Sequence, residues 1–232
     1  MGKDITISGK DGAFGGYLAT PASGTGPAVV VIQEIFGVNP WVRSVADMMA
    51  AEGYMTLAPD LFWRIAPGIQ LDPTKPDEKK HAFALYGKYD FDKALEDIQS
   101  TMTHLRGLPG SSGKVGAMGF CAGGLLTYMA AARSDGDAFS SYYGGGINGK
   151  LDLMGQIKKP TLLHLAAIDD FVPAEAQAKI SDAAAGNANV TVHVYPGVHH
   201  GFCRVPDPSV YDAGACQLAH GRTFELFNKH LA

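Results

Sequence analysis

The run Ala28–Gln33 (AVVVIQ) restricts the fold of this chain more than any other feature, because its first five residues are all apolar. A strand with one face in water alternates apolar and polar side chains, whereas a strand buried on both faces is continuously apolar. Strands buried on both faces belong to parallel sheets that helices cover on each side. The run therefore predicts an α/β fold.

Comparable apolar runs alternate along the chain with segments of helical periodicity. The predicted strands are Ile5–Ser8, Phe14–Thr20, Ala28–Gln33, Tyr54–Ala58, Lys114–Phe120, Ala138–Tyr143, Thr161–Ala166 and Val190–Tyr195. The predicted helices are Pro40–Glu52, Glu78–Tyr86, Asp90–Arg106, Ala122–Arg133, Pro173–Ala185 and Tyr211–His230. Repeated βα alternation predicts a mostly parallel central sheet with helices on both faces. The 232 residues suit one large α/β domain, and we expect a single domain over 1–232.

The charge and apolar content of the chain exclude some partners. Nineteen Lys and Arg against 23 Asp and Glu give a net charge of −4, whereas nucleic-acid surfaces usually carry a basic excess. No stretch approaches the ~18 uncharged apolar residues of a membrane span, and the N-terminus lacks the apolar core of a signal peptide. The chain has only three cysteines, and this small, odd number argues against a disulfide scaffold. We therefore expect a cytoplasmic protein that binds neither nucleic acid nor membrane.

The segment Gly119–Gly123 (GFCAG) follows a predicted strand directly and opens a predicted helix. It matches the nucleophile-elbow pattern G-x-S-x-G with cysteine in place of serine. The helix N-terminus beneath the thiol favours negative charge on sulfur, and the Ala122 N–H is positioned as an oxyanion donor. We predict that Cys121 is the nucleophile. The alternative is a packed structural cysteine.

A triad on such an elbow follows the chain order nucleophile, acid, base. Asp169 and Asp170 come just after one apolar strand, and His199 and His200 come just after the last strand. The carboxyl ends of parallel strands meet at one edge of the sheet, so these side chains are expected near Cys121. Spacing alone does not choose within either pair.

Glu34 and Ile35 end the first long apolar strand, where α/β hydrolases supply the second oxyanion N–H. An ionisable group at the end of a buried strand is either functional or part of a structural ion pair. Both interpretations of Glu34 stay open at this point.

Several segments recur in one order and together resemble the dienelactone hydrolase (carboxymethylenebutenolidase) family. They are residues 33–39 (QEIFGVN), 58–62 (APDLF), 66–68 (APG), 71–73 (LDP), 119–124 (GFCAGG), 142–144 (YYG) and 169–173 (DDFVP). The resemblance extends from about residue 5 to residue 230. It implies a single-domain α/β-hydrolase fold with a triad of Cys121, His200 and Asp169.

The resemblance also implies roles for residues around the triad. The N–H groups of Ile35 and Ala122 would form the oxyanion hole. Glu34 would contact the resting thiol and help to take its proton, and Arg204 would clamp a substrate carboxylate. Phe36 and Tyr143 would contact the substrate.

Two positions depart from the family pattern. Lys79 stands where family enzymes that act on dienelactone carry a second arginine, so the positive charge remains but the bidentate fork is lost. Tyr86 stands where an indole is common. Both changes bear on which substrate fits.

The resemblance implies hydrolysis of the enol lactone 4-carboxymethylenebut-2-en-4-olide to maleylacetate, through a cysteine acyl-enzyme, in the breakdown of aromatic compounds. The alternative enzyme is a broader carboxylesterase, or a promiscuous phosphoesterase, on the same site. A binding or sensor protein on this fold is a third possibility that the intact triad disfavours. We expect a monomer that acts on a small anionic substrate without cofactor or metal, since no H-E-x-x-H or C-x-x-C motif occurs. Cys203 and Cys216 are assigned to packing.

Overall fold

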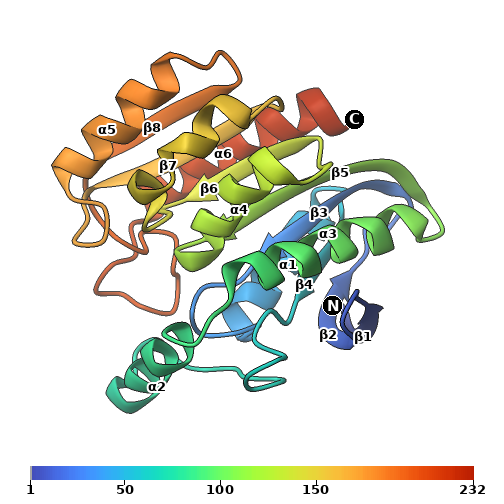
Figure 1. Cartoon of the computed structure of the whole chain (residues 1–232). Coiled ribbons are helices and arrows are strands. Elements are labelled where there is room, and N and C mark those ends of the chain that lie inside the picture. Colours follow the sequence, from blue (N-terminus) through green and yellow to red (C-terminus); the bar gives the residue numbers. More distant parts are fainter. Residues whose placement is uncertain (1) are drawn as a thin grey trace.

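The computed structural model describes residues 2–232, and one eight-stranded sheet runs through this part of the chain (Figure 1). Met1, the first residue of the predicted domain, lies outside the described residues. In spatial order the strands are β1 (Lys3–Ser8), β2 (Ala13–Ala19), β4 (Met55–Pro59), β3 (Gly26–Ile32), β5 (Ser111–Phe120), β6 (Ala138–Tyr142), β7 (Thr161–Ile168) and β8 (Val190–His199). The pairs β1–β2 and β2–β4 are antiparallel, and all later pairs are parallel. The predicted mostly parallel sheet is confirmed.

Helices cover both faces of this sheet. They are α1 (Pro40–Ala51), α2 (Pro76–Tyr86), α3 (Phe91–Gly107), α4 (Ala122–Arg133), α5 (Ala174–Ala185) and α6 (Ala213–Leu231). Helices α3, α4 and α5 pack into one buried apolar cluster, and α1 and α6 pack into another. Helix α2 lies apart from both layers, below the sheet in Figure 1. The sheet is therefore the middle layer of three, as the apolar run in β3 indicates.

The side chains of β3 show directly why its sequence is continuously apolar. Val30 and Ile32 lie in the cluster with α3, α4 and α5, whereas Val29 and Val31 lie in the cluster with α1 and α6. Successive side chains of a strand point to opposite faces, so both faces here need apolar residues. All four residues are fully buried.

Local sequence signals fix where helices begin. Asn39 caps α1 by accepting a hydrogen bond from the N–H of Val42 at 3.1 Å, and Pro40 occupies the first turn, where no amide donor is needed. Asp212 caps α6 by accepting from the N–H of Ala215 at 2.8 Å. This cap explains why α6 begins at Ala213 and not at the predicted Tyr211.

Several strand boundaries and two short helices differ from the prediction. Strands β7 and β8 extend to Ile168 and His199, beyond the predicted ends, because the ladder resumes with Ile168 paired to His199 after an irregularity at Ala166. Two 3-10 helices, η1 (Ile147–Gly149) and η2 (Leu151–Gln156), were not predicted.

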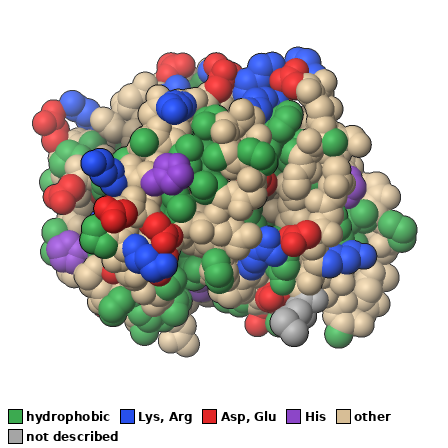
Figure 2. Space-filling model, turned by 90° about the horizontal axis from the view of Figure 1, so that it is seen from below, with side chains coloured by type: hydrophobic (Ala, Val, Ile, Leu, Met, Phe, Trp, Pro, Cys, Tyr) green, Lys and Arg blue, Asp and Glu red, His purple; other side chains and the backbone are tan. Residues whose placement is uncertain are grey.

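Among the described residues no helix has the length and apolarity to cross a membrane. On the face seen in Figure 2, acidic and basic side chains are intermingled with apolar ones.

Candidate active site

Cys121 lies on a tight turn between β5 and α4, as the elbow motif predicts. Its backbone has φ 54° and ψ −115°, an unusual conformation for a residue with a side chain. The flanking glycines are sterically required. A Cβ on Gly119 would lie 2.3 Å from the carbonyl oxygen of Gly123, and a Cβ on Gly123 would lie 2.4 Å from that of Gln33. The turn therefore presents the thiol at the carboxyl end of the sheet, where it is partly exposed.

Of the two acids and two histidines, the structure brings Asp169 and His200 together. The distance from His200 Nδ1 to Asp169 Oδ2 is 2.9 Å. The other carboxylate oxygen, Oδ1, accepts hydrogen bonds from the N–H groups of Phe171 at 2.8 Å and Val172 at 3.2 Å, so Asp169 is itself held in place. Asp170 and His199 are exposed on the walls of the adjacent cavity.

The environment of His200 favours its charged form. Burial alone lowers the pKa of this imidazole, but the negative charge of Cys121 and the hydrogen bond to Asp169 outweigh burial and raise the pKa to about 10. Within residues 2–232, Nε2 of His200 is buried and has no hydrogen-bond partner, which leaves this atom free for a reacting group. At neutral pH the site therefore favours the imidazolium form of His200.

Two aromatic rings fix the plane of the imidazole. The Tyr143 ring centroid lies 5.0 Å from that of His200 in an edge-on arrangement, and the Phe171 centroid lies at 4.7 Å. Phe171 is half exposed at the rim, whereas Tyr143 is fully buried. The predicted contact of Tyr143 with substrate does not fit this position, because Tyr143 lies behind His200 and is not among the lining residues of the cavity. The Tyr143 ring instead packs against the imidazole of His200.

The two residues expected to supply the oxyanion donors both line the cavity. Ile35 follows β3, and Ala122 is the first residue of α4. The first four N–H groups of a helix have no acceptor within the helix, so the Ala122 N–H is free for an oxyanion. Phe36 also lines the cavity, as predicted.

Glu34 and Arg204 form a buried, bidentate ion pair. Arg204 Nε donates to Glu34 Oε2 at 2.7 Å, and Nη2 donates to Oε1 at 2.9 Å. Arg204 Nη1 lies 3.5 Å from Asp207 Oδ2, a second carboxylate that the sequence analysis did not find. Burial lowers the pKa of Arg204, but the Glu34 carboxylate outweighs burial, and the net effect raises the pKa above the usual value for arginine. Glu34 is thus engaged with Arg204, and the guanidinium of Arg204 already has two acidic neighbours.

A cavity of about 370 Å³ opens beside Cys121 and His200. Helix α2 supplies Lys79, Phe83 and Tyr86 to its wall, so the structure places Lys79 and Tyr86, two of the expected substrate-binding residues, at this cavity. The Phe83 ring stacks on Phe171, with centroids 6.4 Å apart, and joins α2 to the loop after β7.

These observations define the class of the site. A nucleophile on a strand-to-helix elbow, followed along the chain by an acid and a histidine at the ends of later parallel strands, is the arrangement of an α/β hydrolase. Within that class, the profile of the dienelactone hydrolase family matches residues 14–231, and the chain belongs to this family.

Individual relatives agree with the family assignment. A protein of Azospirillum brasilense, provisionally named carboxymethylenebutenolidase, is 44% identical and covers 98% of this chain and 99% of its own length. Carboxymethylenebutenolidase 1 of Cupriavidus pinatubonensis is 37% identical, with coverages of 97% and 95%. A crystal structure from Klebsiella pneumoniae, provisionally named dienelactone hydrolase, superposes with a TM-score of 0.84 at 26% identity and covers 98% of each chain.

The structure also brings together three residues to which the sequence analysis gives no shared role. The side chains of Cys203, on the loop that carries Arg204, and of Cys216 and His220, on α6, converge on one another. Cys216 and His220 are four residues apart in a predicted helix, a spacing that places both on one face. That spacing is the sequence signal that could have identified the cluster.

Proposed function

We propose that this protein opens the enol lactone 4-carboxymethylenebut-2-en-4-olide to maleylacetate through an acyl-enzyme on Cys121. The observation that carries the proposal is the presence of Arg204 on the wall of the cavity that contains Cys121 and His200. A buried guanidinium beside a nucleophile suits a substrate with a carboxylate. The names of the relatives at 37% and 44% identity support the same activity.

Acylation begins with the Cys121 thiolate beside protonated His200. The sulfur attacks the lactone carbonyl carbon and forms a C–S bond, while the N–H groups of Ile35 and Ala122 donate to the resulting oxyanion. Collapse of this intermediate breaks the ring C–O bond. The departing enolate oxygen takes the proton from His200 Nε2, which leaves a thioester and a neutral imidazole.

Deacylation reverses these proton movements. Neutral His200 takes a proton from water as the water oxygen attacks the thioester carbonyl. The C–S bond then breaks, the product acid leaves, and the Cys121 thiolate again faces an imidazolium. Asp169 holds Nδ1–H throughout and keeps Nε2 directed at the reacting atoms.

The pairing of Arg204 with Glu34 determines how a carboxylated substrate would bind. A substrate carboxylate would replace Glu34 on the guanidinium of Arg204, so the buried cation keeps a partner throughout. Glu34 would then be released beside the nucleophile and could accept the proton of a Cys121 still in the thiol form. Lys79, at the rim, would add a second positive charge.

A broader carboxylesterase is the second candidate, and a specific observation favours it. The guanidinium of Arg204 faces both Glu34 and Asp207 in the resting site, and much of the remaining wall is apolar, including Ile35, Phe83 and Phe171. A neutral ester could enter without separating any ion pair.

Steady-state kinetics with dienelactone and with p-nitrophenyl acetate separate the two candidates. Loss of a charge-assisted contact worth about 1.5–3 kcal/mol predicts a fall of roughly tenfold to 150-fold in kcat/KM for dienelactone in Arg204→Gln, with the simple ester much less affected. Lys79→Ala should show a smaller, equally selective loss, and Lys80→Ala on the same helix is the matched control. Equal losses on both substrates would refute the carboxylate clamp. A large wild-type preference for the simple ester would favour the second candidate.

We also propose that the protein is cytoplasmic and monomeric. The free state of Cys121, Cys203 and Cys216 supports a reducing compartment. Light scattering after gel filtration tests the oligomeric state, and a mass of two chains would overturn the monomer.

A further inference from the structure

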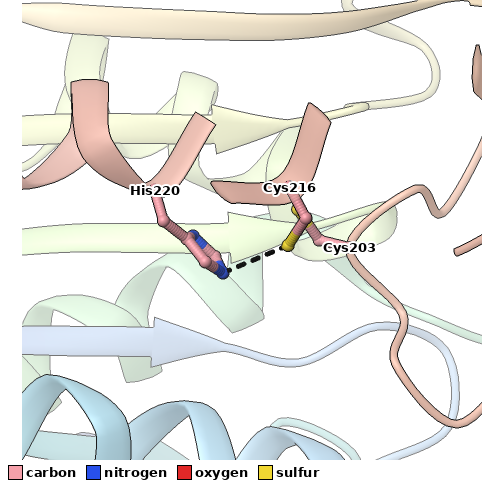
Figure 3. Close-up of side chains that lie close together, drawn as sticks. All are labelled: Cys203, Cys216 and His220. Atoms are coloured by element: carbon pink, nitrogen blue, oxygen red, sulfur yellow. Dashed lines mark hydrogen bonds between the residues drawn. The ribbon is translucent and has the colours of Figure 1, made fainter. Parts of the chain in front are cut away.

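We propose that Cys203, Cys216 and His220 form a binding site for a soft divalent metal ion of the zinc class, separate from the catalytic centre. Figure 3 shows the three side chains converging, with Cys216 and His220 on α6 and Cys203 on the loop that precedes it. Their ligand atoms all lie within 4.8 Å of one another. Two sulfurs and one imidazole nitrogen are a donor set that Zn²⁺ prefers in proteins.

The distances need little adjustment to accept an ion. Cys216 Sγ lies 3.4 Å from His220 Nε2. In a tetrahedral zinc site with Zn–S of about 2.3 Å and Zn–N of about 2.05 Å, these two atoms would be about 3.6 Å apart. An i,i+4 pair on one helix face holds that separation without loop movement. Cys203 then closes the third position, and the fourth is left for water.

The surroundings of His220 direct the correct nitrogen at the cluster. His220 Nδ1 lies 2.9 Å from the Tyr142 hydroxyl. That hydroxyl has two other acceptors for its single proton, the carbonyl oxygen of Ala219 at 3.3 Å and Thr223 Oγ1 at 2.6 Å. When the Tyr142 hydroxyl donates its proton in a hydrogen bond to either of these acceptors, His220 Nδ1–H donates to the Tyr142 oxygen. His220 Nε2 then keeps its lone pair directed toward Cys216. Metal-binding histidines are usually oriented by such a bond from the other nitrogen.

Burial and charge also fit a metal ion. Cys203 and Cys216 are buried, whereas His220 is half-buried and opens a path to solvent. Both thiols would release their protons to the buffer on binding, so the two thiolates and the divalent ion form a neutral unit. A neutral unit is tolerated in the apolar cluster around these cysteines, whereas free thiolates are costly there.

Occupancy would connect α6 to the loop that carries the catalytic histidine. Cys203 precedes Arg204 directly and lies three residues after His200. The loop is already tied to the start of α6 by the hydrogen bond from the N–H of Asp212 to the carbonyl oxygen of Phe202 at 3.0 Å. A metal bridge would therefore act as a second tie, and its expected effect is on the stability of the loop.

The test uses Co²⁺ as a spectroscopic probe on the full chain carrying Cys121→Ser, which removes the nucleophile as a competing ligand. The protein is reduced, stripped of metal and titrated with Co²⁺. We expect one equivalent to produce S-to-Co charge-transfer absorption in the near ultraviolet together with the intense visible bands of a tetrahedral ion. One equivalent of Zn²⁺ should abolish both. At a free Zn²⁺ concentration 100 times Kd, Tm should rise by about 5 °C or more.

Variants locate the site. Cys216→Ser and His220→Gln should abolish the charge-transfer absorption or weaken Co²⁺ binding at least 100-fold. Tyr142→Phe, which removes only the hydroxyl that orients His220, should weaken it by about tenfold to 100-fold. His230→Gln, on the same helix but outside the cluster, is the matched control, and circular dichroism checks that each variant is folded.

Three results would overturn the proposal. The first is the absence of sulfur-to-metal absorption with a Kd weaker than 10⁻⁵ M, about the affinity of a non-specific surface site. The second is binding that Cys216→Ser leaves unchanged in folded protein. The third is rapid loss of two titratable thiols in air without metal uptake, because that outcome identifies a redox-active dithiol in place of a metal site.

Discussion

The buried pair between Glu34 and Arg204 makes a sharp prediction about stability. Both side chains are almost completely excluded from water, with exposures of 1% and 7%. Removal of one partner leaves the other charge buried without compensation, which typically costs about 3–5 kcal/mol of unfolding free energy. For a chain of this length the loss corresponds to a fall in Tm of about 6–20 °C. We expect the fall in Tm to lie near the lower end of this range for Glu34→Gln and near the upper end for Arg204→Gln. The reason is that Asp207 loses its partner only in Arg204→Gln.

A double-mutant cycle measures whether the pair acts as a unit. Urea unfolding of wild type, both single variants and Glu34→Gln/Arg204→Gln should give a double variant that is much less destabilised than the sum of the singles, because two facing amides can hydrogen-bond to each other. Glu175→Gln, in the exposed pair with Lys179, is the control and should leave the unfolding midpoint unchanged. Additive losses across the cycle, or single losses below about 1 kcal/mol, would refute the claim that the pair is buried and coupled.

Three further predictions follow from the site. Because the pKa of His200 is raised to about 10, kcat/KM should hold its maximum below that pH and decline as pH rises through it. The stability that the His200 cation contributes is fully present below the pKa of an unfolded histidine, near 6.5, and is lost as pH rises to about 10. A pH profile of kcat/KM with its alkaline limb near 7 would contradict the raised pKa of His200. Asp169→Asn should lower kcat by roughly 10²–10⁴ and shift that alkaline limb to lower pH, with Asp170→Asn near wild type in the same assay. Gly201→Ala should lower Tm more than Gly197→Ala, since both have positive φ but only the Cβ at 201 would lie 2.9 Å from a buried guanidinium, and equal shifts would remove the steric argument.

The sequence was sufficient for the sheet and the elbow because both depend on local patterns. A continuous apolar run such as Ala28–Gln33 requires two covered faces, and β3 has them. The elbow depends on small residues at two fixed positions, and Gly119 and Gly123 each face a backbone oxygen that a side chain would strike. Nothing distant in the chain is needed for either inference.

The choice between neighbouring residues at the site was beyond local patterns. Asp169 and Asp170 are neighbours in the loop after β7, and the structure shows that the Asp169 carboxylate is the one that reaches His200. His200 follows β8, so this contact depends on how β7 and β8 pair and not on the local sequence after β7. The resemblance to a family favoured Asp169, whereas spacing alone could not.

Long-range pairing was the other gap. Glu34 and Arg204 are separated by 170 positions, and neither segment carries a sequence signal that the two side chains form a buried ion pair. The same limit applies to Cys203, which joins Cys216 and His220 only because the loop after β8 folds back over α6. Contacts of this kind form only when the fold brings distant segments together, and periodicity and motif spacing do not predict them.

The loop after β8 carries both the proposed base and the proposed carboxylate clamp in one short segment. His200, the proposed base, and Arg204, a buried cation four residues later, lie on the same cavity wall. The Arg204 N–H donates to the carbonyl oxygen of Gly201 at 2.7 Å, so the two functional side chains are related by one tight turn. A shift of the loop therefore moves the base relative to Cys121 and the cation relative to Glu34 at the same time. Perturbations of this turn should change kcat and KM together, whereas Lys79→Ala on α2 should change KM for carboxylated substrates alone.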